Sequence, residues 1–164
     1  FSYALNDNQM ESYSGAIGHS TVIFNNSSHM PKISRFLFGE WIQSPKSSFS
    51  PGINSFKCTY NNYLKFKHSR EILATKNGWK IIDIFSGPFK NAMLQWRLPT
   101  KNWRLSGKKL FCNNATMIFD IDKSCKLKLI KKEESLYYMH RSYIPVLRIT
   151  ASKSNTITTN IYFD

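Results

Sequence analysis

Short segments rich in β-branched and aromatic residues, separated by proline or glycine at close intervals, are the feature that most constrains the fold of this chain. Residues 125–129 alternate apolar side chains with lysines, and residues 147–150 alternate in the same way. That alternation has the period of a strand with one buried face. No long window shows a helical stripe, so the sequence predicts an all-β antiparallel β-sandwich of about eleven short strands. The expected strands are residues 20–24, 33–42, 53–67, 70–76, 79–85, 92–98, 108–112, 115–122, 125–132, 146–152 and 156–163.

The length of 164 residues suits a single domain that spans residues 1–164. Hydrophobic residues make up 41% of the chain, which is enough to bury a core without a metal or a disulfide. Inside this domain, Asn77-Gly78 predicts a β-hairpin with a type I′ turn, because that turn needs two residues with positive φ.

A net charge of +13 predicts affinity for polyanions such as nucleic acid, anionic lipid or an acidic polysaccharide, and a soluble basic domain without such a partner is the alternative. The most basic run, at residues 126–132, is followed at once by Glu133 and Glu134, and no RNP-type motif occurs, so nucleic acid is not the expected partner. Apolar runs are too short for a membrane span. The chain contains no C-x-x-C pair, G-x-S-x-G, P-loop or G-x-G-x-x-G motif, which leaves zinc-knuckle, hydrolase-triad and nucleotide-binding readings without support.

His19 stands at the start of an apolar run, with Gly15 and Gly18 before it and Ser20 and Thr21 after it. The glycines allow the backbone to approach another group closely, and a neutral imidazole is the commonest metal ligand in proteins. The sequence alone therefore leaves two interpretations open: a metal ligand, or a histidine that is hydrogen-bonded at the beginning of a strand.

His68 and Arg70 lie two residues apart and therefore share one face of a predicted strand. They form either an anion-facing, substrate-binding pair or part of a solvated edge. Asp83, inside the apolar segment 79–85, needs a buried partner, for which Arg70 or Arg97 on a neighbouring strand is expected. We interpret Asp83 as part of a structural ion pair.

The order of several motifs resembles that of heparinase II/III-like polysaccharide lyases. "FSYALNDNQMESYSGAIGHSTVIFNN" is similar to the family's stretch from Asp-x-Gly-x-x-x-Tyr to His-Asn-Thr-Val. On this match Tyr3 is the tyrosine, and Ser20 replaces the asparagine after His19. "HSREILATKNGWKIIDIFSG" looks like the His-x-Arg and Trp-x-x-x-Asp strands, and "LQWRLPTKNW" and "SLYYMHRSYIPVLRI" look like later family segments.

This resemblance implies a C-terminal β-sandwich of a lyase that cleaves uronic-acid-containing glycans, heparin-like or alginate-like, by β-elimination. It implies that Tyr3 lies near the cleft, and we expect Tyr3 to be catalytic. His68 and Arg70 are the expected substrate-binding residues. In several family members a zinc ion is held by an upstream His-x-His, by the Asp of Asp-x-Gly and by the histidine that matches His19. The resemblance also implies a periplasmic or secreted location, an acidic polysaccharide as partner, and an N-terminal helical toroid of the same parent protein.

The chain begins just after the place where Asp-x-Gly is expected, and the His-x-His element and the toroid are not in it. We therefore expect the parent protein to be the lyase, and this chain alone to be inactive or nearly so. A non-catalytic sandwich that binds acidic carbohydrate is the main alternative, and a remnant or truncated product is another.

Overall fold

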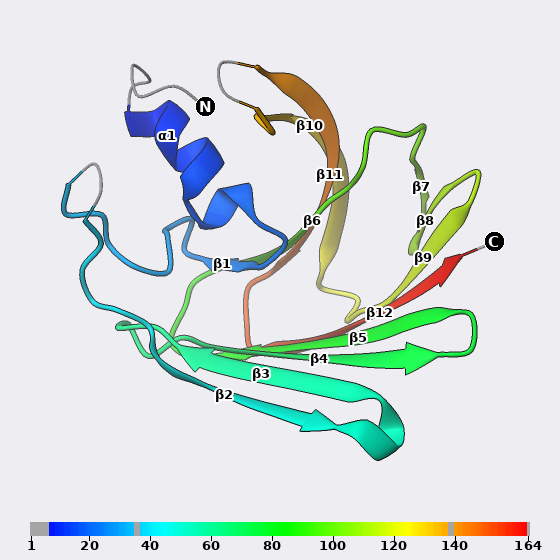
Figure 1. The fold of residues 1–164 in the computed structure, drawn as a ribbon, viewed down its shortest axis with the longest axis horizontal. Coiled ribbons are helices and arrows are strands. Elements are labelled where there is room, and N and C mark those ends of the chain that lie inside the picture. The colour runs from blue at the N-terminus through cyan, green and yellow to red at the C-terminus, as the bar shows by residue number, and fades with distance from the viewer. Residues whose placement is uncertain (1–6, 35–36, 138–139, 164) are drawn as a thin grey trace.

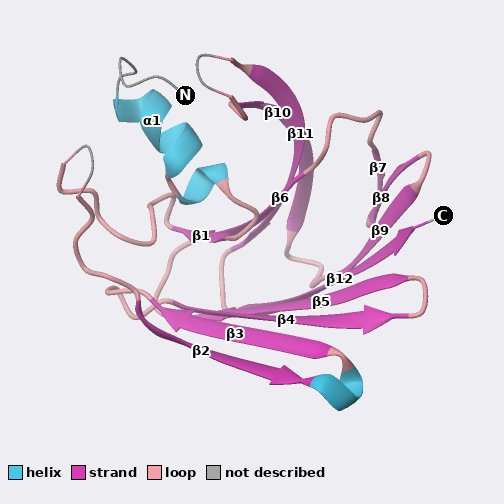
Figure 2. Cartoon of the chain, viewed as in Figure 1, coloured by secondary structure: helices cyan, strands magenta, loops and turns pink. Residues whose placement is uncertain are grey.

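The computed structural model describes residues 7–34, 37–137 and 140–163 and consists mainly of antiparallel strands in two sheets (Figures 1 and 2). The helical elements are α1 (Asp7–Ser14) and the single 3-10 turns η1 (Ala16–Gly18) and η2 (Pro51–Ile53). The strands are β1 (Val22–Phe24), β2 (Gln43–Ser50), β3 (Ser55–Asn61), β4 (Lys67–Thr75), β5 (Gly78–Ser86), β6 (Ala92–Arg97), β7 (Arg104–Ser106), β8 (Lys109–Cys112), β9 (Ala115–Asp120), β10 (Lys126–Glu134), β11 (Ser142–Ala151) and β12 (Asn155–Phe163). The predicted all-β antiparallel sandwich is confirmed, with these twelve strands in the described residues.

One sheet has four strands in the order β1-β6-β11-β10, and the other has eight in the order β2-β3-β4-β5-β12-β9-β8-β7. All of these strand pairings within the two sheets are antiparallel. Helix α1 and the turn η1 lie against the face of the four-stranded sheet that points away from the larger sheet (Figure 1). There Ala16 and Ile17 pack on Ile23 and Met93.

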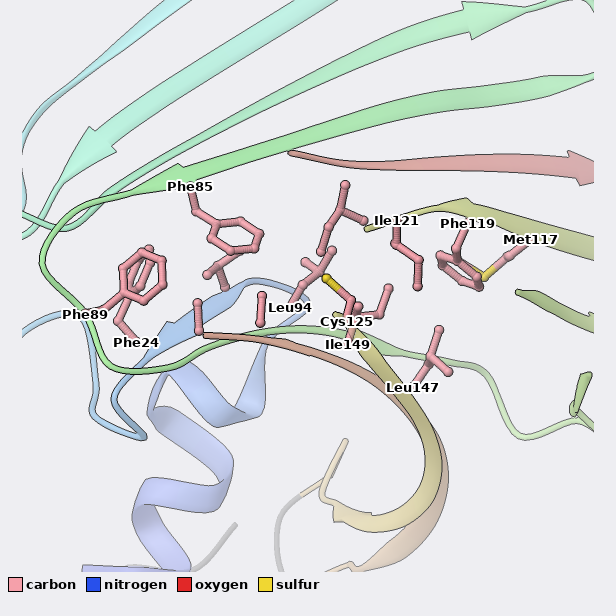
Figure 3. Close-up of a cluster of buried hydrophobic side chains, with 14 of the residues drawn as sticks. Phe24, Phe85, Phe89, Leu94, Met117, Phe119, Ile121, Cys125, Leu147 and Ile149 are labelled. Atoms are coloured by element: carbon pink, nitrogen blue, oxygen red, sulfur yellow. The ribbon is translucent and has the colours of Figure 1, made fainter. Parts of the chain in front are cut away.

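The core lies between the two sheets and is made from the inward-facing side chains of both (Figure 3). Leu147 and Ile149 come from β11, and Phe119 and Ile157 come from the larger sheet; each is at most 1% exposed. Four phenylalanines close one end of this core, with Phe24 in the centre: its ring centroid lies 5.2 Å from those of Phe66 and Phe89. The period-2 alternation in β11 and β12 thus turns one apolar set inward, as the sequence predicts.

The larger sheet extends beyond the area that the smaller sheet covers. Phe49 on β2, Phe56 on β3, Ile72 on β4 and Ile81 on β5 are successive register partners, so they share the inward face. Ile81 is 6% exposed, whereas Phe56 is 45% and Phe49 is 65% exposed. The inward face of the larger sheet is therefore shielded from solvent under β6 and β11 but exposed to solvent at β2 and β3.

Two predicted strands differ from the structure. Of residues 33–42, the described part forms only an isolated bridge between Lys32 and Phe38 and no strand. The single strand expected over 53–67 is interrupted after Asn61, because the Asn62 side-chain oxygen accepts from the N–H groups of Leu64 and Phe66 and closes a turn.

The hairpin between β4 and β5 is present, but its predicted type I′ turn is wrong. Thr75 pairs with Gly78, so Lys76 and Asn77 are the two turn residues, and neither has a positive φ. Gly78 is required for a different reason: a Cβ there would lie 1.9 Å from the carbonyl oxygen of Ile161. The sequence prediction also missed α1, β2 and β7.

Candidate functional site

His19 lies on a short connection between α1 and β1, which we call the His19 loop (residues 15–21). The Gly18 N–H donates to Gly15 O at 2.8 Å, and the His19 N–H donates to Ala16 O at 3.1 Å, so η1 is a tight turn. A Cβ on Gly18 would lie 2.6 Å from the backbone oxygen of Tyr13. The expectation of a close backbone approach is therefore confirmed for Gly18, and the loop needs glycine there.

The carbonyl groups of the His19 loop are held by donors from the sheets beneath it. Gln95, 1% exposed on β6, donates through Nε2 to the carbonyl oxygens of Ile17 and His19, at 2.7 Å each. Arg70 Nη1 donates to Ser20 O at 2.7 Å, and the Gln95 backbone N–H donates to Thr21 O at 3.0 Å. These hydrogen bonds hold the backbone of the His19 loop on the sheets at four carbonyl groups.

The imidazole of His19 is exposed at an open hollow of about 200 Å³. Its lining also includes Gly15, Ser28, His29 and Phe38. The His19 ring is thus not shut into the hydrophobic core. Its role as a metal ligand stays a prediction.

His29, beside His19, is already engaged. Its Nε2 donates to Val22 O at 2.7 Å, and the Tyr60 hydroxyl lies 3.0 Å from the same nitrogen. Burial lowers the pKa of His29 below its usual value of 6.5, which favours the neutral ring. Burial also raises the pKa of Tyr60, so that its phenol stays protonated.

His68 and Arg70 face the interior, and their shared anion is Asp83 of the same chain. Asp83 is fully buried; its Oδ1 accepts from His68 Nε2 and Arg70 Nε at 2.7 Å each, and its Oδ2 accepts from Arg70 Nη2 at 3.2 Å. The guanidinium carbon of Arg70 also lies 4.7 Å from the centre of the Trp96 ring. The predicted Asp83–Arg70 ion pair is therefore confirmed.

The solvated-edge alternative for this pair is wrong, because β4 lies between β3 and β5 and His68 is 4% exposed. The substrate-binding role of His68 and Arg70 stays a prediction; in the structure their acceptors are Asp83 and Ser20. Through Ser20 the buried ion pair supports the His19 loop directly. Tyr3, the predicted catalytic residue, lies outside the described residues.

Gln95 is the functional residue that the sequence reasoning missed. Its signal was a lone amide inside the apolar segment 92–98, because a buried polar side chain needs hydrogen-bond partners. Ser20, next to His19, connects the loop to β6: Ser20 Oγ accepts from the Arg97 backbone N–H at 2.9 Å.

The described residues do not by themselves form a zinc site. They contain no group of three or more His, Cys, Asp or Glu side chains arranged to hold a metal ion, and zinc in proteins usually takes about four ligands. His19 fits as one exposed imidazole ligand only. The described helices also include none that is long and apolar enough to cross a bilayer.

The fold and the site define a β-sandwich domain. It has a four-stranded and an eight-stranded antiparallel sheet, and an exposed histidine on a braced loop at the smaller sheet. The family model "Heparinase II/III-like, C-terminal" matches residues 3–155. The chain belongs to this family.

Solved structures share this fold. A structure titled heparinase III with methylated lysines matches with a TM-score of 0.78 and 18% identity, over 98% of this chain and 26% of that one. Heparan sulfate lyase HepC from Pedobacter heparinus matches with a TM-score of 0.72 and 18% identity, over 100% and 28%. A further heparinase III matches with a TM-score of 0.70 and 11% identity, over 99% and 26%. The chain thus spans about a quarter of the length of these proteins; no curated protein sequence matches it.

Proposed function

We propose that this chain is the C-terminal β-sandwich of a polysaccharide lyase that cleaves uronic-acid-containing acidic glycans, heparan-like or alginate-like, by β-elimination. Family membership supports the lyase class, and the structural relatives include proteins named heparinase III and heparan sulfate lyase. The observation that carries the proposal is the exposed His19, on a loop whose carbonyls are held by Gln95 and Arg70. Such bracing keeps a functional imidazole in position without closing it off from a ligand.

β-Elimination next to a uronate has three requirements. A positive group must offset the carboxylate charge, a base must remove the C5 proton, and an acid must protonate the leaving glycosidic oxygen. The net charge of +13 suits the first requirement. For the other two we expect residues of an N-terminal helical domain of the same parent protein, together with Tyr3.

Zinc is part of the proposal for the parent protein only. There His19 would supply one ligand, and a bound zinc ion would fix the local backbone and contribute positive charge near the substrate carboxylate. The remaining ligands would come from residues N-terminal to this chain. A periplasmic or secreted location is likewise proposed from family membership alone.

The test compares this chain with a longer parent protein on heparan sulfate and alginate, by following the ultraviolet absorbance of the unsaturated uronate product. We expect turnover by the parent and little or none by the chain. His19→Ala in the parent should reduce turnover strongly, whereas His140→Ala, at an exposed histidine that does not line the hollow at His19, should leave it unchanged. A parent that cuts neither glycan would refute the lyase proposal. Robust turnover by the chain alone would refute the proposal that catalysis needs residues of the N-terminal helical domain.

A non-catalytic sandwich that binds acidic carbohydrate is the second candidate. It is favoured by the charge and by the observation that the described part of the chain contains no group of three or more His, Cys, Asp or Glu side chains that could hold a metal ion. This candidate predicts binding of the glycan by the parent protein with no product absorbance, and no effect of His19→Ala on that binding.

A further inference from the structure

Three lysines and an arginine line one outward face of the four-stranded sheet, and we call them the basic face: Lys126, Lys128 and Lys132 on β10 and Arg148 on β11. Leu127 and Leu129 pack against the core, so the intervening lysines point away from it. Leu147 and Ile149 likewise face inward and leave Arg148 on the outer side. β10 is the edge strand of its sheet (Figure 1). Its three lysines on the basic face are exposed.

Lys128 and Arg148 are direct register partners on this face. Opposed like charges on neighbouring strands destabilise a sheet. The neighbouring acids do not relieve the pair: Glu134 Oε1 lies 3.4 Å from Arg97 Nη2, and Glu133 accepts from the hydroxyls of Tyr13 and Tyr143. The juxtaposition of Lys128 and Arg148 is therefore unfavourable in the free chain.

The Arg148 guanidinium also lacks acceptors. Its Nε and Nη2 are buried, and no atom of the described residues accepts a hydrogen bond from either. They adjoin a hollow of about 150 Å³ that Arg148 shares with Ser28, Met93 and Glu11. The Glu11 carboxylate accepts from the Ser28 hydroxyl and does not accept from Arg148 Nε or Nη2. Leaving a buried donor without an acceptor is destabilising, and more so for a charged group.

We propose that Lys128 and Arg148 form a subsite for a sulfate or carboxylate group of an acidic polysaccharide, with Lys126 and Lys132 contacting further anionic groups along β10. An oxyanion placed between the two side chains would turn a repulsive pair into a clamp and would supply the acceptors that Arg148 lacks. The choice of a glycan rests on the function proposed above. The row of cations along the edge strand β10 would by itself suit any chain of anionic groups.

The experiment measures binding of a size-defined heparin oligosaccharide to the full chain by calorimetry at fixed ionic strength. Lys128→Gln should weaken binding about three- to tenfold, and Arg148→Gln about tenfold or more. The matched control is Lys80→Gln, at an exposed lysine on β5 of the other sheet, which should change binding less than about twofold. Equal losses for Lys128→Gln and Lys80→Gln would overturn the subsite, because binding would then follow net charge alone.

Thermal unfolding of the same variants without ligand gives a second readout. Lys128→Gln should match or exceed the wild-type melting temperature, since it removes a repulsion, while still binding heparin less tightly. A lowered melting temperature together with unchanged binding would contradict the proposal. This test remains informative if Arg148→Gln fails to fold.

Single-stranded DNA at the same salt concentration tests the glycan assignment. Weaker binding than heparin, with a smaller effect of Lys128→Gln, is expected; equal affinity and equal loss would refute glycan recognition at this face. If the parent protein shows no lyase activity but the Lys128 effect on heparin persists, the proposed enzymatic function falls and the subsite stands.

Discussion

Removing the charge of Asp83 tests whether the buried ion pair holds the β4–β5 region together. Asp83→Asn keeps the size of the side chain but removes the anion that accepts from His68 and twice from Arg70. It leaves the Arg70 guanidinium, whose side chain is 19% exposed, without a counter-ion. On at least one side, the amide N–H groups of the new asparagine also face the N–H groups of His68 or Arg70, so that two donors oppose each other.

The size of the effect follows from this geometry. Breaking a buried pair by removing one partner costs about 3–5 kcal/mol. Arg70 keeps its bond to Ser20 O and its contact with the Trp96 ring, which favours the lower end, about 3 kcal/mol. For a chain of this length that corresponds to a melting temperature about 6–12 °C lower.

The assay is urea unfolding of the full chain followed by tryptophan fluorescence and circular dichroism. Asp120→Asn is the matched control, since Asp120 is exposed on β9 of the same sheet, and it should change stability by less than about 0.5 kcal/mol. Combining Asp83→Asn with Arg70→Met should cost less than the sum of the two single changes. An Asp83→Asn variant as stable as the control would show that the buried pair contributes nothing, and the reasoning would be wrong.

Three further predictions concern the loop, the pH dependence and the core. Gln95→Leu should cost about 1–3 kcal/mol and speed amide hydrogen exchange in residues 17–21, because Ile17 O and His19 O lose their donor; unchanged exchange would refute the bracing role. Since burial lowers the pKa of His29, its contribution to stability is complete above about pH 6.5 and is lost as the pH falls through the folded-state pKa. Melting temperatures between pH 8 and pH 5 should therefore depend less on pH in His29→Gln, whereas a slope identical to wild type would contradict this assignment. Phe85→Ala, at a 1% exposed ring between Phe24 and Phe89, should lower the free energy of unfolding by about 3–5 kcal/mol in the same urea assay; a loss below 1 kcal/mol would mean that this end of the core is not close-packed.

The sequence predicted well those strands that bury one face, because alternation records which side chains point inward. β2 was missed because Gln43–Ser50 is polar and contains a proline, so its strand conformation follows from backbone pairing with β3 at the sheet edge. α1 was missed because eight residues with no basic last turn and little apolar content carry almost no helical signal. The conformation of these elements depends on their contacts with distant parts of the chain, and the local sequence does not show those contacts.

The site was predicted in the same uneven way. A carboxylate in an apolar strand demanded a partner, which led from Asp83 to Arg70. The same rule applied to Gln95 would have predicted that its amide has hydrogen-bond partners, but not that these are the carbonyls of the His19 loop. The opposed cations Lys128 and Arg148 depend on the register between β10 and β11, which no local pattern in the sequence encodes.

The unequal widths of the two sheets have a practical consequence for anyone handling this chain. Phe49 on the edge strand β2 and Phe56 on its neighbour β3 present aromatic rings to water. Such a surface adheres to other copies of itself and to hydrophobic resins. Purification yield and apparent size should therefore depend on protein concentration, and dilute samples with mild non-ionic detergent are the right starting condition for every measurement described above.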